Sequence, residues 1–322
     1  MLAAMLLAAC GGSDDGGEGS QQNLIPTEIC VRTNLATMQT RAATVDNIAS
    51  LQTKDLKIDA YYRGTNEKYF DGSMLHYTGG DPAWVFWAAG AQTHYYWPFE
   101  GSTVTIAGEP TTASALDFVG FCPYTKPSYI GAPTYDHSTG AVSFTCDMSS
   151  YMTLAQQANM EEFLVSVLTN QTLATQTAAG GALPMVFKHP LALIKFTITA
   201  ASGTHVQINS ISISDLKTSG TCTYNGSTMT WGSYSGSATM TIAQVLKNGG
   251  TTESTPFLVI PYNYGSKYLT VNATWDDWSD VTISDYGTNV DFNWEPGYIY
   301  TYNLTLDKYG LKVNISKFTE QW

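Results

Sequence analysis

Histidines and carboxylates are the side chains of this 322-residue chain that could carry acid–base or metal chemistry. The histidines are His76, His94, His137, His189 and His205. They form no HExxH motif and no paired spacing, so the sequence predicts no zinc site. A catalytic histidine would need a nucleophile and an orienting acid beside it, and no motif indicates either. We therefore interpret His189, between Lys188 and Pro190, as a structural residue.

The carboxylates give a similar result. The segment WDDWSD at residues 275–280 could bind Ca²⁺, but it lacks the EF-hand spacing and glycine, which favours a solvated acidic turn. A glycosidase needs two carboxylates across a cleft, and the spacing of Asp117, Asp147, Glu161 and Asp276 indicates no such pair. We predict no catalytic, cofactor-binding or metal-ligating residue, and we expect a protein that is not an enzyme.

Cys10 is the side chain whose position does predict a chemistry. It follows an apolar segment, residues 1–9, that is too short to span a bilayer, since a spanning helix needs about 20 apolar residues. This segment is typical of a signal peptide without its basic n-region, so we expect the true start upstream. Leu7-Ala8-Ala9-Cys10 resembles the lipobox of bacterial lipoproteins, which implies acyl chains on Cys10 and a stable membrane anchor. An ordinary apolar N-terminus is the alternative.

The residues after Cys10 predict an exposed tether. Residues 10–26 are rich in Gly and Ser, a composition that behaves as a flexible chain. Ser13-Asp14-Asp15 resembles the short acidic signal that sends some lipoproteins to the outer face of the outer membrane. We therefore expect a surface-exposed lipoprotein.

Composition narrows the class of partners and the class of fold. The formal net charge is −12 with a pI near 4.7, and no basic cluster is present, so nucleic acid is not an expected partner. The 20 tyrosines outnumber the 15 lysines and arginines, and such a composition favours strands joined by turns. Cys30, Cys122, Cys146 and Cys222 form no CxxC pair, and both disulfides and buried thiols remain open.

Alternating apolar residues predict strands from residue 27 onward. In EICVRTNL, Ile29, Val31 and Leu35 share one face, and Cys30, Arg32 and Asn34 share the other. KYFDGSMLHY, residues 68–77, is predicted to form a hairpin that turns at Asp71-Gly72. A phase shift within residues 206–213 predicts a β-bulge, and residues 152–160 are the best helix candidate.

A Thr-, Ala- and Gly-rich stretch at residues 175–181 interrupts this pattern and predicts a domain boundary. We expect an N-terminal domain at residues 27–182 and a C-terminal domain at residues 183–322. Many short strands at this spacing predict an all-β chain with two antiparallel β-sandwich domains.

Several segments resemble the fimbrillin family, the subunits of type V pili and their surface-lipoprotein relatives. They are HYYWPF, ALDFVGFCPY, EEFLVS, LPMVFKHPLALIKFTI and the C-terminal WEPGYIYTYNLTLDKYGLKVNISKFTEQW. The resemblance covers most of the chain and implies transthyretin-like, Greek-key sandwiches without cofactors. It implies a structural, tip or accessory subunit of a fimbria that acts in adhesion and has other pilus subunits as partners.

The resemblance also implies a mechanism of assembly. An arginine-specific protease removes the first strand, and the vacated groove accepts a strand of the next subunit by β-strand addition. Here the cut would fall at Arg41-Ala42 and would remove Ile29, Val31 and Leu35. An ordinary surface arginine is the alternative.

The candidate donor strand lies near the C-terminus of the chain. Leu311, Val313 and Ile315 alternate with the spacing needed to refill the vacated groove. An ordinary closing strand is the alternative for this segment. The sequence leaves open whether the subunit serves as stalk, tip, anchor or non-polymerising relative.

Aromatic clusters at residues 84–87 and 95–97 support a second function, a stand-alone outer-membrane carbohydrate-binding lipoprotein. Exposed rings could stack on sugars. Because adjacent residues of a strand face opposite sides, each cluster divides between the core and the surface, and we expect core packing for most of these rings.

Overall fold

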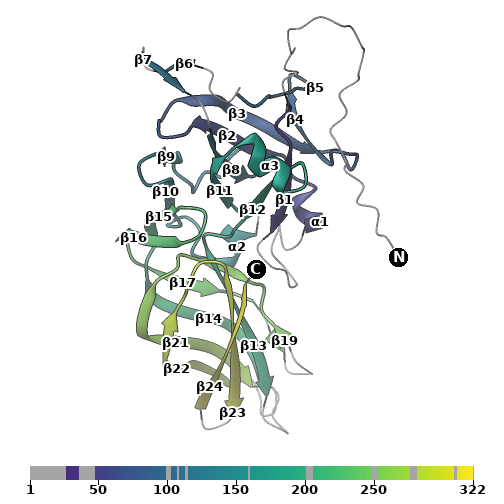
Figure 1. Cartoon of the computed structure of the whole chain (residues 1–322). Helices are drawn as coiled ribbons and strands as arrows, with labels where there is room; N and C mark the ends of the chain where they lie inside the picture. The colour runs from purple at the N-terminus through teal and green to yellow at the C-terminus, as the bar shows by residue number, and fades with distance from the viewer. Residues whose placement is uncertain are drawn as a thin grey trace, which may run out of the picture.

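The computed structural model describes residues 27–35, 48–98, 103–106, 109–112, 115–158, 160–200, 206–244, 246–247, 252–275, 281–307 and 310–321. Strands dominate these residues (Figure 1), which confirms the predicted all-β fold. The described helices are short, and none of them is long and apolar enough to cross a membrane.

The helices are α1 (Ile48–Leu51), α2 (Leu154–Gln157) and α3 (Leu173–Ala178). The strands of the first half are β1 (Val31–Leu35), β2 (Leu56–Tyr62), β3 (Lys68–Tyr77), β4 (Trp84–Ala88), β5 (Ala91–Gln92), β6 (Thr103–Ile106), β7 (Glu109–Thr112), β8 (Leu116–Cys122), β9 (Thr134–Asp136), β10 (Ala141–Asp147), β11 (Leu164–Gln171) and β12 (Leu183–Phe187). The strands of the second half are β13 (Ala192–Ala200), β14 (Val206–Leu216), β15 (Ser219–Tyr224), β16 (Met229–Ser235), β17 (Ala238–Ile242), β18 (Leu246–Lys247), β19 (Thr252–Glu253), β20 (Phe257–Val259), β21 (Asn263–Trp275), β22 (Val281–Asn293), β23 (Tyr298–Asp307) and β24 (Gly310–Gln321).

The upper part of the molecule in Figure 1 is built around one six-stranded antiparallel sheet in the order β11-β8-β2-β3-β4-β5. One face of this sheet packs on β1 and β12 through a core that includes Ile58, Phe118 and Met185. The other face, at β2, β8 and β11, packs on β9 and β10 through Phe121, Phe144 and Val165. The sheet therefore lies between two smaller layers.

The lower part is a β-sandwich. One sheet has the order β19-β13-β23-β24, with β20 also paired to β13, and the other has the order β17-β14-β21-β22, with β18 paired to β14. Alternate residues of both sheets share one core, for example Phe196, Ile211, Val271 and Leu304, because each strand turns every second side chain inward.

Three strands that follow the predicted boundary at residues 182 and 183 lie in sheets with strands that precede it. β12 pairs with β1, and Leu183, Met185 and Phe187 lie in the core of the upper part. β15 and β16 extend the sheet of β9 and β10, with Phe144 opposite Cys222. The exact limits of the two domains stay a prediction.

Two strand pairs depart from the predicted antiparallel pattern. β1 pairs parallel to β12, and β13 pairs parallel to β23. Each pair joins segments that are more than a hundred residues apart, so no hairpin fixes their relative direction. Alternation of apolar residues reports which face is buried and carries no information on strand direction.

The structure agrees with the sequence at one predicted local feature, a bulge, and differs from it at a hairpin and at the helices. The bulge in β14 is confirmed, since the register shifts between Ile208 and Ser210. The hairpin at Asp71-Gly72 is wrong: β3 runs through this dipeptide, and Gly72, at φ +62°, adopts the left-handed conformation within a bulged register. The helix expected at residues 152–160 is limited to α2, and α3 occupies part of the stretch that was interpreted as a break.

Candidate functional site

The segment predicted as the removable first strand lies in the core of the upper part. Ile29, Val31 and Leu35 are 1%, 2% and 5% exposed and belong to one core cluster with Leu183, Met185 and Phe187 of β12. Arg32 and Asn34 face outward as predicted, whereas Cys30 is also buried. We call this position of residues 27–35, between β12 and residues 95–97, the first-strand groove.

Backbone hydrogen bonds hold the segment on both edges. On one edge β1 pairs parallel to β12, from Val31 opposite Leu183 to Leu35 opposite Phe187, and Leu183 N donates to Cys30 O at 2.8 Å. On the other edge Ile29 N donates to Tyr95 O at 2.7 Å, and Trp97 N donates to Thr27 O at 2.9 Å. Removal of the segment would therefore leave unpaired groups on both walls of the groove.

A side chain continues the ladder beyond Leu183, where β12 begins. Gln176 of α3 is 4% exposed; its Oε1 accepts from Cys30 N at 3.0 Å, and its Nε2 donates to Glu28 O at 2.9 Å. These two groups flank Ile29 in the way that a residue of a parallel neighbour strand would meet them. Trp97 Nε1 donates to the same Oε1 at 3.0 Å, so the amide bonds to the wall at residues 95–97 as well as to the strand.

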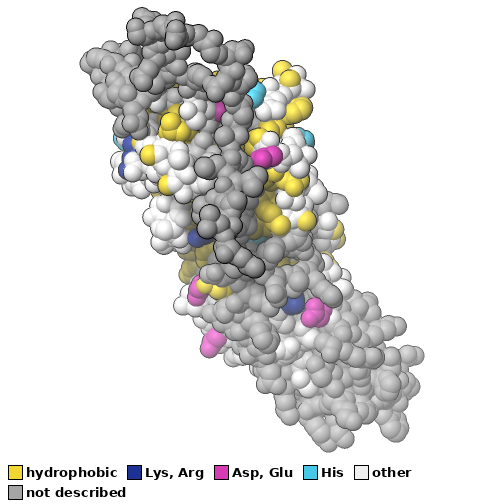
Figure 2. Space-filling view, turned by 45° about the vertical axis from the view of Figure 1, so that its right-hand side comes forward, with side chains coloured by type: hydrophobic (Ala, Val, Ile, Leu, Met, Phe, Trp, Pro, Cys, Tyr) yellow, Lys and Arg dark blue, Asp and Glu magenta, His cyan; other side chains and the backbone are white. Residues whose placement is uncertain are grey.

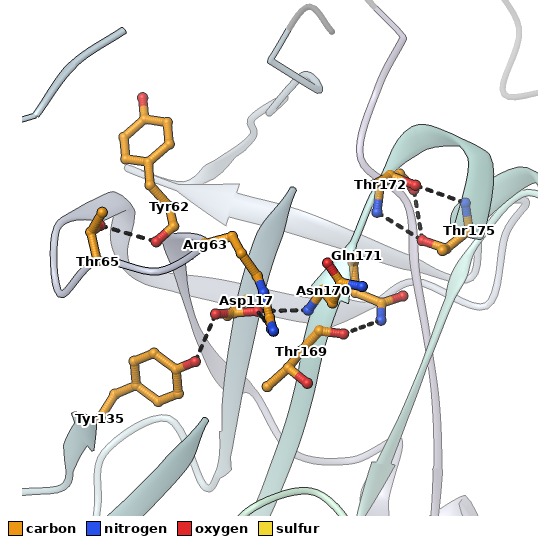
Figure 3. A network of polar contacts seen from close by, with 10 residues as sticks. All are labelled: Tyr62, Arg63, Thr65, Asp117, Tyr135, Thr169, Asn170, Gln171, Thr172 and Thr175. Atoms are coloured by element: carbon orange, nitrogen blue, oxygen red, sulfur yellow. Dashed lines mark hydrogen bonds and ion pairs between the residues drawn. The ribbon is translucent and has the colours of Figure 1, made fainter. Parts of the chain in front are cut away.

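A polar network lies at the end of β11, just before α3 begins (Figure 3). Asp117, 1% exposed, accepts from Arg63 Nη1 at 3.0 Å, from Tyr135 OH at 2.8 Å and from the backbone N of Asn170 at 2.6 Å. Asn170 is at φ +58° within β11, where the register with β8 shifts between Leu168 and Gln171. Burial raises the pKa of the Tyr135 hydroxyl, and the hydrogen bond to Asp117 raises it further.

A capping box then starts α3. Thr172 Oγ1 accepts from Thr175 N at 3.2 Å, and Thr175 Oγ1 accepts from Thr172 N at 2.8 Å (Figure 3). After one and a half turns, Gly180 and Gly181 take φ values of +81° and +93°, and the chain enters β12. The amide of Gln176, on α3, meets the backbone groups of Glu28 and Cys30 just before the chain enters β12.

Gly120 of β8 lets β12 lie close to the central sheet. A Cβ at this position would lie 2.9 Å from Met185 Cε and 2.9 Å from Phe187 Cζ, which is closer than ordinary carbon contacts. The glycine therefore leaves room for the side-chain ends of Met185 and Phe187 against the central sheet.

One buried polar atom in the strand has no hydrogen-bond partner among the residues that the structure describes. Thr33 alternates with Val31 and Leu35, and its Oγ1 is buried without a hydrogen bond to any described residue. An unpaired buried hydroxyl costs roughly 1–3 kcal/mol. The strand that fills the groove is thus not its best possible occupant.

Other predicted site residues lie outside these contacts. Cys10, Arg41 and Ala42 fall outside the described residues. Leu311, Val313 and Ile315 belong to β24, whose backbone pairs antiparallel with β23 at Leu306, Leu304 and Tyr302, while their side chains are not described.

The candidates for catalytic or metal chemistry are spread over the molecule. His189 Nδ1 lies 2.7 Å from Glu162 Oε1 in a fully buried pair, Glu161 pairs with Lys54, and Asp147 accepts from Ser149 N. Asp276 and His205 are not described. Among the residues that the structure covers, no group of three or more His, Cys, Asp or Glu side chains could hold a metal ion. No disulfide joins Cys30, Cys122, Cys146 and Cys222.

The aromatic clusters divide between core and surface. Trp84, Phe86 and Trp97 are buried, and Tyr95 stacks on Phe70 with ring centroids 4.1 Å apart. Tyr96 is 40% exposed. Figure 2 shows hydrophobic side chains gathered on one side of the upper part, with histidines among them. Core packing, the expected arrangement, holds for most of these rings.

Comparison with known proteins gives the same picture of the fold. The fimbrillin-like family model matches residues 110–322. A fimbrial protein from Bacteroides vulgatus has a similar structure, with a TM-score of 0.61, 13% identity and coverage of 92% of this chain and 99% of that one. A candidate cell adhesion protein from Bacteroides ovatus has a TM-score of 0.53, 15% identity and coverage of 92% and 97%.

At this level of identity the two structures establish similarity of fold alone. Among curated protein sequences, none matches the chain. The family model covers about two thirds of the sequence, and the segments that carried the resemblance fall largely within it. The chain belongs to the fimbrillin-like family.

Proposed function

We propose that this protein is a non-enzymatic surface subunit of a fimbria or a related adhesive assembly, and that it accepts a neighbour's strand in the first-strand groove. The observation that carries the proposal is the placement of residues 27–35. They fill an apolar groove, pair on both edges and precede the candidate cut at Arg41. A cut there would separate this strand covalently from everything else that forms the groove.

The groove has the two properties that β-strand addition requires. Backbone groups on β12 and at residues 95–97 supply affinity that does not depend on sequence, and the pockets of Ile29, Val31 and Leu35 supply selectivity. The similarity to a fimbrial protein and the family membership support an adhesion-related role at the cell surface.

The unpaired hydroxyl of Thr33 favours replacement of the chain's own first strand by a neighbour's strand. If Leu311 and Val313 of a neighbour took the places of Ile29 and Val31, Ile315 would take the place of Thr33. The apolar side chain would remove the cost of the unpaired hydroxyl. In the monomer β24 closes its own sheet by pairing with β23, so donation requires that β24 first leave this sheet.

The anchor is part of the same proposal. Acyl chains on Cys10 would hold the subunit at the outer membrane, and the tether at residues 10–26 would let the folded part extend from it. Removal of the first strand would also release the subunit from its anchor, which couples assembly to detachment. Metabolic labelling with a palmitate analogue should mark the wild type and fail on Cys10→Ala.

Protease treatment of the soluble chain tests the assembly step. The Cys10→Ser chain is incubated with an arginine-specific protease and analysed for ladders that resist detergent. We expect ladders with the parent chain and none with Arg41→Ala, while Arg32→Ala serves as the matched control and should still assemble. Clean cleavage at Arg41 with a product that stays monomeric and binds no added strand would contradict the proposal.

The carbohydrate-binding alternative has weaker support. Most rings of the two aromatic clusters pack in the core, whereas the side chain of Tyr96 is 40% exposed. A glycan array with the uncut chain separates the two functions, since a strand acceptor needs no sugar ligand.

A further inference from the structure

The hairpin of β15 and β16, residues 219–235, adds two strands of the second half of the sequence to a sheet of the upper part. Its flanking strands, β14 and β17, are antiparallel neighbours in one sheet of the lower sandwich. Between them the chain leaves this sheet, and β15 pairs antiparallel with β10, from Val142 opposite Tyr224 to Asp147 opposite Ser219. Figure 1 shows the hairpin beside β10, where the two parts meet. We call residues 219–235 the clasp.

The clasp buries side chains in a core that both parts share. Cys222 and Tyr224 are 0% and 1% exposed, and Cys222 lies opposite Phe144 of β10. The same core cluster contains Val165 of β11 and Phe196 of β13. Because burial of apolar surface stabilises each of these contacts, opening the clasp would cost free energy in both parts of the molecule.

The tip of the clasp lies against β11. Gly226, in the turn between β15 and β16, is at φ +90°, a conformation that side chains of L-residues disfavour. A Cβ on Gly226 would lie 2.7 Å from Val167 O, closer than Cβ atoms approach other atoms in proteins. The backbone of the turn is therefore in direct contact with the backbone of β11.

The clasp also contacts the connection between β12 and β13. Lys188 N donates to Val165 O at 2.9 Å, and Val165 N donates to Lys188 O at 3.1 Å, so the chain just beyond β12 is paired with β11. Lys188 Nζ lies 5.5 Å from the centroid of the Tyr224 ring, and Trp231 Nε1 donates to Pro190 O at 2.9 Å. The connection is therefore held both by β11 and by the clasp.

These contacts hold the end of β12 without help from the first strand. β12 is the wall of the first-strand groove that pairs with β1, and Lys188 follows its last residue, Phe187. The backbone bonds of Lys188 go to β11, so they remain when β1 is removed. A wall that is already in place need not be ordered when a new strand enters, which favours binding.

We propose that the clasp preorganises the first-strand groove: it joins the two parts into one folding unit, and it keeps the end of β12 on β11 after the first strand has left. The second statement rests on the proposed function, because it concerns the groove between two occupants. Residues of the second half of the sequence thus act as positioning residues for a binding site in the upper part.

The first test uses the uncut Cys10→Ser chain and three of its own thiols. Cys122 ends β8 of the central sheet, Cys146 and Cys222 lie in the ladder between β10 and the clasp, and all three are buried. A buried thiol reacts with iodoacetamide only when its surroundings open, so the rate of labelling reports the free energy of opening. We expect the three rates to agree within about threefold, because one folding unit opens as a whole. Rates at Cys146 and Cys222 that exceed the rate at Cys122 by about tenfold or more would show that the clasp opens alone and would overturn the inference.

The second test follows the Lys188 amide after the first strand is gone. The chain is cut after Arg41, the first strand is removed, and hydrogen exchange is measured by NMR. The amide of Leu183 should lose its protection, because it donates to Cys30 O of the removed strand. The amide of Lys188 should stay protected, because it donates to β11. Exchange at Lys188 as fast as at Leu183 would overturn the inference.

Gly226→Ala and its control, Gly90→Ala, test the contact of the clasp with β11. Gly90, in the turn between β4 and β5, is at φ +81° and has open space around its Cβ position. Both substitutions strain the backbone, but only Gly226→Ala collides with Val167 O. In the stripped chain, exchange at Lys188 should be at least about fivefold faster in Gly226→Ala than in Gly90→Ala, about the factor for one hydrogen bond. Equal exchange in the two variants would overturn the inference.

Trp231→Phe gives a second variant if Gly226→Ala does not fold. It removes the hydrogen bond to Pro190 O, and its control is Trp294→Phe, since Trp294 Nε1 donates to Tyr302 OH at 2.8 Å in the lower part. The same contrast of about fivefold is expected at Lys188, and its absence would overturn the inference.

Failure of the proposed function gives a different result. If the stripped wild type keeps its Lys188 amide protected and binds no added strand, strand acceptance fails and the clasp stands. If the chain is not cut at Arg41, the proposed processing fails, and the thiol rates of the uncut chain decide whether the clasp joins the two parts.

Discussion

Thr33→Val removes a buried hydroxyl group from the first strand. Thr33 lies on the buried face of β1, and its Oγ1 has no hydrogen-bond partner among the described residues. Valine keeps the branched shape and replaces the hydroxyl by a methyl group. The substitution should stabilise the chain, although most substitutions within a core destabilise.

The magnitude follows from the environment of the hydroxyl. An unpaired buried hydroxyl costs roughly 1–3 kcal/mol, and part of this gain is lost if the methyl group packs imperfectly. We expect the free energy of unfolding of the uncut chain to rise by about 1 kcal/mol. After a cut at Arg41, the same gain should slow replacement of the chain's own strand about fivefold, since about 1.4 kcal/mol corresponds to a factor of ten.

Urea unfolding followed by tryptophan fluorescence measures the first quantity, and exchange with a labelled peptide measures the second. Thr223→Val is the matched control, because Thr223 Oγ1 shares a hydrogen bond of 2.8 Å with Ser143 Oγ. This control should lose about 1 kcal/mol. A destabilised Thr33→Val chain, or faster exchange of its first strand, would refute the argument that the strand is a suboptimal occupant.

Three further predictions concern the core that holds the groove. Ile29→Ala should lower the free energy of unfolding, measured by urea unfolding, by about 2–5 kcal/mol. Arg32→Ala, on the outward face, should change it by less than about 0.5 kcal/mol. Equal losses would contradict the burial of this strand. Burial raises the pKa of Asp59 above its usual value near 3.8, so the charged carboxylate destabilises the folded chain. The free energy of unfolding of Asp59→Asn, relative to that of the wild type, should therefore grow as the pH rises from 3.5 to 7. A constant or falling difference in urea unfolding would count against this prediction. Burial also raises the pKa of the Cys122 thiol to about 12. Iodoacetamide at pH 8 should therefore label Cys122 slowly in the folded chain and rapidly in denaturant. Rapid labelling without denaturant would contradict this prediction and would show that the site opens.

The sequence predicted the fold class because alternation survives in nearly every strand. Ile29, Val31 and Leu35 repeat every second residue, and the structure buries all three. Cys30 was assigned to the outer face, but α3 covers this end of the strand and buries it as well. Alternation describes a strand with one free face, and it fails where a third element covers the other face.

Gln176 could not be found from the sequence. It bonds to Cys30 across 146 residues, and no local pattern reports such a contact. The small residues at 175–181 favoured a break, because threonine and alanine with two glycines are typical of a linker. Thr172 and Thr175 form a capping box in the structure, but Thr175 stands where the usual motif has Glu or Gln, so the sequence lacked the signature of a helix start. The direction of β1 relative to β12 was equally hidden, since it depends on tertiary packing.

The most direct measurement of strand acceptance is hydrogen exchange at β12, which forms one wall of the first-strand groove. It is followed by mass spectrometry in three samples: the uncut chain, the cut chain after its first strand is removed, and the assembled ladders. We expect slow exchange of the β12 amides in the uncut chain, fast exchange in the cut monomer and slow exchange again in the ladders. Slow exchange in the stripped monomer, or fast exchange that persists in the ladders, would contradict the claim that a neighbour's strand fills this groove.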